Sequence, residues 1–162
     1  MPDMLVKLYN LENNWSFIQE QEKLGITIRK PIGPERHYVI EWVRQAFGEV
    51  WASEVDMAFS SWPITCFIAL KSKELIGFAC YDATGLGFFG PFGVAESHRR
   101  KGTGRALLLA CLLEMRMKSY GYAIIGWTDL TDYYHKTVGA EVIPDSTPSV
   151  WKDMLKSQDA HA

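Results

Sequence analysis

One stretch, residues 90–120, constrains this 162-residue chain more than any other part of it. Its sequence is GPFGVAESHRRKGTGRALLLACLLEMRMKSY: an apolar run, a polar turn, and a basic, glycine-bearing segment before strong helix formers. The first N–H groups of a helix lack internal partners and carry the positive end of the helix dipole. Glycines there let an anion approach the backbone, and Arg99, Arg100, Lys101 and Arg105 add positive charge. The stretch therefore predicts a strand, a turn and a helix start that bind phosphate.

The spacing of the glycines distinguishes this turn from other phosphate-binding turns. The P-loop pattern is absent from the chain, and G-x-G-x-x-G fails at this turn because its third position is Leu107. A literal G-x-G-x-x-G match at residues 85–90 is followed by another strand-like run, so we interpret it as coincidental. What remains is R-x-x-G-x-G, Arg99 to Gly104, between a strand and a helix.

Length and charge limit the organisation of the chain and the class of its partner. A chain of 162 residues with 48% hydrophobic residues suits a single domain with a buried core, which we assign to residues 1–162. The net charge of −2 argues against a nucleic-acid surface and favours a small partner.

The cysteines and the hydropathy indicate the compartment. Cys66, Cys80 and Cys111 lie in apolar runs without ligand-like spacing, which predicts buried free thiols and no metal site. No run of ~18 apolar residues and no leader pattern is present, so we expect a cytoplasmic protein without membrane contact.

The order of expected elements follows from hydrophobic periodicity. Leu5, Leu8, Leu11 and Trp15 predict an amphipathic helix over residues 4–20, as an N-terminal addition. Strands are expected at 26–32, 64–70, 75–81, 86–94, 122–127 and 140–143, and helices at 34–47, 49–59, 130–138 and after the glycine turn. Pro91 cannot donate to a ladder, so a bulge is expected that parts its strand from a neighbour and exposes backbone groups to a ligand.

This order and two motifs resemble the GNAT superfamily of N-acetyltransferases, and the chain resembles bacterial members that carry GFFGP before the turn. Arg99 to Gly104 is similar to the family's acetyl-CoA pyrophosphate turn, and Tyr133 to Val142 is similar to its F-Y-x-K-x-G-F segment with one extra residue. The resemblance implies an α/β (α+β) fold with a mixed, mostly antiparallel sheet of about six strands flanked by helices. The expected divisions are an N-terminal helical extension at 1–25, the GNAT core at 26–143 and a C-terminal tail at 144–162.

The resemblance also implies where acetyl-CoA binds. Backbone N–H groups from Arg100 to Gly104, with Arg105 and Ala106, would hold the pyrophosphate, while Arg99 orders the turn. The residues of this expected turn are Arg99, Arg100, Lys101, Gly102, Thr103, Gly104, Arg105 and Ala106. Phe92, Gly93 and Val94 would pair with pantetheine; the alternative is a kinked core strand. Arg100 stands where the family usually has glycine, and Trp127 or Thr128 where it often has a pantetheine-binding asparagine.

The catalytic expectations concern Tyr134 and Glu54. By resemblance, Tyr134 would protonate the departing thiolate, a role that suits a phenol of pKa ~10; the alternative is a core aromatic. No motif marks the base, and Glu54 is the candidate because its helix lines the acceptor side in this fold. Beside it, Trp51, Trp62 and Trp127 would suit a cation with an apolar body.

The implied function is transfer of an acetyl group from acetyl-CoA to a primary amine of a small molecule or peptide, by direct attack and without a metal. The alternatives are a non-catalytic acetyl-CoA-binding regulatory module and a protein N-terminal or lysine acetyltransferase. A homodimer is left open. The acceptor pocket is built from loops without a transferable code, so the acceptor is not predicted.

Overall fold

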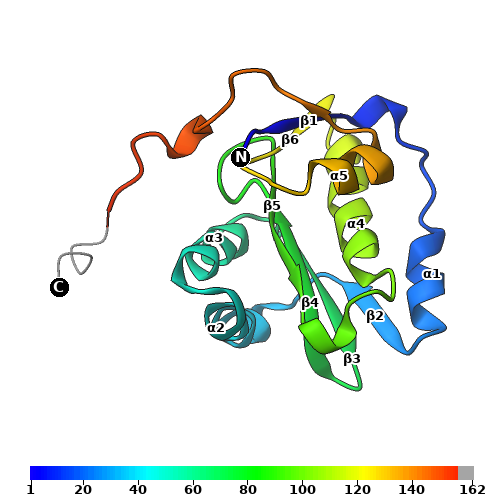
Figure 1. The fold of residues 1–162 in the computed structure, drawn as a ribbon. Helices are drawn as coiled ribbons and strands as arrows, with labels where there is room; N and C mark the ends of the chain where they lie inside the picture. Colours follow the sequence, from blue (N-terminus) through cyan, green and yellow to red (C-terminus); the bar gives the residue numbers. More distant parts are fainter. Residues whose placement is uncertain (157–162) are drawn as a thin grey trace.

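The computed structural model describes residues 1–156, which form one sheet covered by helices on both faces (Figure 1). The strands are β1 Met4–Lys7, β2 Ile26–Arg29, β3 Cys66–Lys71, β4 Glu74–Tyr81, β5 Phe88–Val94, β6 Tyr122–Ile125 and β7 Glu141–Val142. The helices are α1 Ser16–Glu22, α2 Arg36–Phe47, α3 Glu49–Phe59, α4 Thr103–Met117 and α5 Thr131–Val138. Among the described residues, no helix combines the length and the apolar character needed to cross a bilayer.

The sheet has seven strands in the order β2-β3-β4-β5-β6-β1-β7. Every neighbouring pair with a described register is antiparallel except β5 and β6, which α4 connects as a parallel pair. Helices α2 and α3 cover one face, and α1, α4 and α5 cover the other (Figure 1). Each face has its own buried core, and the core beneath α4 is the larger of the two.

The mixed, mostly antiparallel sheet is confirmed, but the expected helix over residues 4–20 is wrong in its first half. Residues 4–7 form β1, which lies between β6 and β7, and only Ser16–Glu22 is an α-helix. Met4, Val6 and Leu8 are buried at a spacing of two, the period of a strand. The three-residue spacing of Leu5, Leu8 and Leu11 concealed this signal. The N-terminal residues are thus part of the sheet, which has seven strands rather than about six.

After β7, the chain continues without a strand or α-helix through residue 156, apart from a 3-10 turn at Ser149–Trp151. This is the expected C-terminal tail, of which residues 157–162 lie outside the described part. The turn carries Trp151 back toward the start of β5, where its ring meets Phe88. The tail therefore borders the centre of the sheet.

The expected bulge in β5 is confirmed at Gly90 and Pro91. On one side Phe89 pairs with Tyr81 and Phe92 with Ala79, so β5 has one more residue between these pairs than β4. On the other side, β5 pairs with β6 at Phe88 and Phe89 alone. Beyond the bulge, the β6-facing edge of residues 92–94 has no strand partner in the described chain. The two central strands therefore part at the bulge.

Helix α2 packs tightly on the part of β5 that follows the bulge. A β-carbon added at Gly93 would lie 2.5 Å from the ring of Phe47. We expect Gly93→Ala to lower the free energy of unfolding by about 1–3 kcal/mol, because the ring must move out of a packed core. Urea denaturation measures the change.

The matched control is Gly121→Ala, since a β-carbon at Gly121 meets nothing within 4 Å. Equal stability of the two variants would contradict the described packing of α2 on β5.

Candidate active site

The glycine turn before α4 has the shape expected of an anion site. The guanidinium Nε of Arg99 donates to the carbonyl of Val94 at 3.1 Å, which ties the turn to the end of β5. Gly102 is in the left-handed region with φ of 79°, and Arg100 is there too with φ of 64°. Glycine adopts this region without strain, whereas another residue does so at a cost of about 1–2 kcal/mol. Arg100 thus keeps the conformation of the glycine that the resemblance implies, at some cost in backbone energy.

The backbone N–H groups of this turn are available to a ligand. No described residue accepts a hydrogen bond from the N–H groups of residues 100–105, and the first such bond is donated by Ala106 to the carbonyl of Gly102 at 2.9 Å. Arg99, Arg100, Lys101 and Arg105 are exposed around them. A row of free donors at the positive end of α4, with basic side chains around it, fits a pyrophosphate.

Gln21 of α1 holds the turn from beneath and was missed by sequence reasoning. Its side-chain amide donates to the carbonyl of Lys101 at 2.9 Å and accepts from the hydroxyl of Thr103 at 2.7 Å. Gln21 is only 4% exposed, so both partners depend on it for hydrogen bonding. The available signal was a polar residue four positions after Phe17, on the apolar face of a short helix.

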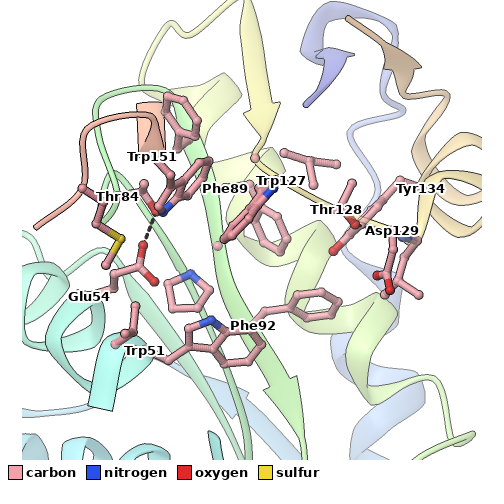
Figure 2. Close-up of a pocket in the computed structure, with 18 residues that line it drawn as sticks. Trp51, Glu54, Thr84, Phe89, Phe92, Trp127, Thr128, Asp129, Tyr134 and Trp151 are labelled. Atoms are coloured by element: carbon pink, nitrogen blue, oxygen red, sulfur yellow. Dashed lines mark hydrogen bonds between the residues drawn. The ribbon is translucent and has the colours of Figure 1, made fainter. Parts of the chain in front are cut away.

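A cavity of about 410 Å³ opens where β5 and β6 part (Figure 2). Its walls come from α3, the β4–β5 loop, β5, the end of β6, the start of α5 and the tail. The lining residues are Val50, Trp51, Glu54, Thr84, Phe88, Phe89, Gly90, Pro91, Phe92, Ile125, Gly126, Trp127, Thr128, Asp129, Leu130, Tyr134, Trp151 and Met154. Two predicted catalytic residues, Glu54 and Tyr134, are among them, on opposite sides of the cavity in Figure 2.

Glu54 reaches the cavity from the middle of α3. Its carboxylate accepts a hydrogen bond of 2.5 Å from the hydroxyl of Thr84 in the β4–β5 loop. Burial raises the pKa of Glu54 above its usual range, and the Thr84 hydrogen bond opposes part of that shift. A half-buried carboxyl with a raised pKa is a stronger base than an ordinary surface carboxylate.

Tyr134 lies on the first turns of α5, and its ring packs against those of Phe89 and Phe92 on β5. The side chain is 4% exposed, and burial raises its pKa, with Tyr133 and Asp129 adding to the shift. No hydrogen bond from its hydroxyl to another described residue is found, while the side chain lines the cavity. The phenol is thus a core aromatic that also faces the cavity, and it stays protonated at neutral pH.

Trp127 and Trp151 form one wall of the cavity. Their rings stack at 5.7 Å between centroids and 25° between planes. Gly126 makes room for Trp151, because a β-carbon there would lie 2.4 Å from the ring. The buried Asp3 accepts hydrogen bonds from the backbone of Trp127 and from Ser149, beside Trp151. Asp3 therefore fixes both tryptophans.

The expected place of Trp62 beside Glu54 is wrong. Trp62 is 90% exposed and lines none of the described cavities. Asp56, on the same helix as Glu54, is exposed and pairs with Arg36. Trp151, Thr84 and Asp3 were not predicted, because their place at the cavity depends on contacts between distant parts of the chain.

The described residues include no group of three or more His, Cys, Asp or Glu side chains placed to hold a metal ion. All three cysteines are buried and unpaired.

Several solved structures with the same fold are described as N-acetyltransferases. The glucosamine N-acetyltransferase region of a fungal multi-domain β-N-acetylglucosaminidase superposes with a TM-score of 0.71 and 14% identity, over 88% of this chain and 19% of that one. A GCN5-related N-acetyltransferase from Sphaerobacter thermophilus gives 0.59 and 19%, over 88% and 48%. One from Kribbella flavida gives 0.53 and 15%, over 87% and 53%. The chain thus spans about half of two of these proteins and about a fifth of the third.

These likenesses define the fold as that of GNAT N-acetyltransferases. The sequence pattern of the acetyltransferase (GNAT) family matches residues 36–139, and the chain belongs to this family. No curated protein matches the sequence at a significant level.

We expect Gln21→Leu to lower the free energy of unfolding by about 1–3 kcal/mol, because the carbonyl of Lys101 and the hydroxyl of Thr103 lose buried partners. The matched control is Gln19→Leu, the same change on the exposed side of α1. Thermal or urea denaturation of both variants measures the difference. Equal effects would show that Gln21 does not hold the turn.

Proposed function

We propose that this protein transfers the acetyl group of acetyl-CoA to a primary amine by direct attack. The observation that carries the proposal is the parting of β5 from β6. The free edge of residues 92–94 meets the cavity at Phe92, and Gly104 of the turn lies beside Phe92 and Val94. An extended, anionic cofactor and an amine acceptor each have a matching surface there.

The cofactor half of the site would use residues of the turn and of β5. The N–H groups and basic side chains of Arg100, Lys101 and Arg105, with the backbone of residues 102–106, suit the pyrophosphate. The free edge of Phe92, Gly93 and Val94 suits the amides of pantetheine, which would add to the sheet like a strand. Arg99 would act through the conformation of the turn, since it bonds to Val94.

In the chemical step, Glu54 would take one proton from the bound ammonium group, which leaves a neutral amine. The amine attacks the thioester carbonyl, so that a C–N bond forms and the C–S bond then breaks. Tyr134 gives its phenol proton to the departing sulfur, and the nitrogen's second proton restores the phenol. Glu54 releases its proton to solvent, so the net products are the amide, free thiol and one proton. The raised pKa of Glu54 suits a base, and the phenol of Tyr134 stays protonated at neutral pH, so that it has a proton to donate.

We expect CoA and acetyl-CoA to stabilise the protein while NAD and ATP do so far less. A ligand at 100 times its dissociation constant adds ~2.7 kcal/mol to the free energy of unfolding. Differential scanning fluorimetry measures the effect, and equal shifts for CoA and NAD would count against the cofactor assignment.

Gly104 supplies a matched pair of variants for this binding test. A β-carbon at Gly104 would lie 3.7 Å from Phe92 and 3.8 Å from Val94, an ordinary contact distance. Gly104→Ala should therefore keep the fold. The branched side chain of Gly104→Val should fill the space between α4 and β5, and we expect it to abolish CoA binding. Unchanged CoA affinity in Gly104→Val would place the cofactor elsewhere.

We expect Tyr134→Phe to reduce the turnover number by about 10²–10⁴, the contribution of a positioned general acid, where chemistry limits the rate. The ring and its contacts with Phe89 and Phe92 remain, so acetyl-CoA binding should be nearly unchanged. Thiol release with an amine acceptor measures the rate.

Tyr133→Phe is the control, because adjacent residues on a helix point about 100° apart. Tyr133 does not line the cavity, and its variant should keep most of the activity. Equal losses in the two variants, or full activity of Tyr134→Phe under rate-limiting chemistry, would remove Tyr134 as the acid.

A further inference from the structure

The lining of the cavity near Glu54 is rich in aromatic residues, and its charged side chains are all of one sign. Its seven aromatic residues are Trp51, Phe88, Phe89, Phe92, Trp127, Tyr134 and Trp151. Its charged residues among the described part are Glu54 and Asp129, both carboxylates, and the lining includes no Lys, Arg or His. A positive group therefore has partners in the cavity, whereas a carboxylate or phosphate on the acceptor has none.

The adjoining cavity has a similar balance of charge. It measures about 750 Å³ and shares Glu54, Thr84 and Trp151 with the first cavity. Its charged lining comprises Glu49, Glu54, Asp153 and Lys152, so carboxylates outnumber the single cation. The neighbouring surface thus also favours the approach of a cation over that of an anion.

The two threonine hydroxyl groups that line the cavity each have a hydrogen-bond partner in the protein. The hydroxyl of Thr84 donates to Glu54 at 2.5 Å, and the hydroxyl of Thr128 accepts from the backbone of Leu130 at 3.0 Å. An acceptor that carries many hydroxyl groups, such as an amino sugar, would lose hydrogen bonds to water and find few replacements. An apolar acceptor meets no such cost.

The arrangement of the aromatic side chains in the cavity suits a flat ring on the acceptor. Trp127 and Trp151 stack nearly parallel, and Gly126 and Asp3 hold them in that arrangement. Figure 2 shows Trp51 below Glu54 and Trp151 above it in this view. A ring bound among these side chains would place an amine on a short linker near the carboxylate, while aromatic faces attract ammonium groups.

We propose that the acceptor is an arylalkylamine: a primary amine on a short linker from an aromatic ring, without a carboxylate or phosphate. This inference rests on the proposed function, since it names the acceptor of the same reaction. The ring occupies the space by Trp127 and Trp151, and the ammonium group pairs with Glu54, which takes its proton.

The test compares amines that differ by a single carboxylate. Acetyl-CoA turnover is measured by thiol release with tryptamine against tryptophan and with phenethylamine against phenylalanine, and with glucosamine and spermidine as further acceptors. We expect the decarboxylated member of each pair to have a kcat/KM about 100-fold higher, because the extra carboxylate would lie within several ångströms of Glu54 without a cation beside it. Equal values within each pair, or preference for the amino acid, overturns the inference.

The tail provides variants that test the position of the ring. Trp151→Ala should raise the KM for tryptamine about tenfold and leave the KM for acetyl-CoA unchanged, while Trp151→Phe should restore most of the affinity. Trp62→Ala is the matched control, since Trp62 is 90% exposed and lies away from the described cavities. An unchanged KM for tryptamine in Trp151→Ala overturns the placement of the ring.

The two levels of the proposal fail in different ways. If CoA does not bind, the proposed function fails, and the acceptor class fails with it. If CoA binds and glucosamine, spermidine or an amino acid is acetylated while the arylalkylamines are not, the function stands and the acceptor class is wrong. If CoA binds and none of the amines is acetylated, the arylalkylamine inference is also overturned.

Discussion

The parting of β5 from β6 is the constraint on which the rest of this structure depends. In the interior of a sheet, nearly all backbone N–H and C=O groups bond to the neighbouring strands. Two central strands therefore separate only where a local irregularity interrupts these hydrogen bonds. Here the bulge at Gly90 and Pro91 is that irregularity. The opening exposes one edge of β5, leads to the start of α4 and makes space for the aromatic cavity. One local irregularity thus accounts for both the free edge of β5 and the space of the cavity.

Two residues of the N-terminal segment, Gln21 and Asp3, support the glycine turn and the aromatic wall of the cavity. Gln21 supports the turn before α4 through Lys101 and Thr103. Asp3 lies at the edge of β1 and binds Trp127 and Ser149, which positions the aromatic wall. Neither residue falls within residues 36–139, the part that the family pattern matches. The matched part therefore provides strands β3 to β6 and the turn, and the flanking segments add the other strands and support the cavity.

The sequence predicted those features that depend on neighbouring residues. The turn of Arg99 to Gly104 was recognisable because its glycines, charges and helix lie within a few positions of one another. Glu54 and Tyr134 line the same cavity, and their catalytic roles stay predictions. Trp151 and Asp3 were not predictable, since their place at the site arises from contacts across more than 20 and 120 residues, respectively. Strand β1 was misread because Leu5, Leu8 and Leu11, of which only Leu5 lies in the strand, also fit a helical period.

The position of Trp151 on the tail has a consequence for the evolution of specificity. Trp151 and Met154 line the cavity, although residues 149–154 belong to no strand or α-helix of the described fold. Insertions or substitutions in such a segment leave the sheet and the turn intact. Relatives can therefore diverge in the amine that they select by exchanging a few residues beyond β7, while the acetyl-donor half is inherited without change. A search for differences in specificity should begin in the segment that conventional family boundaries leave out.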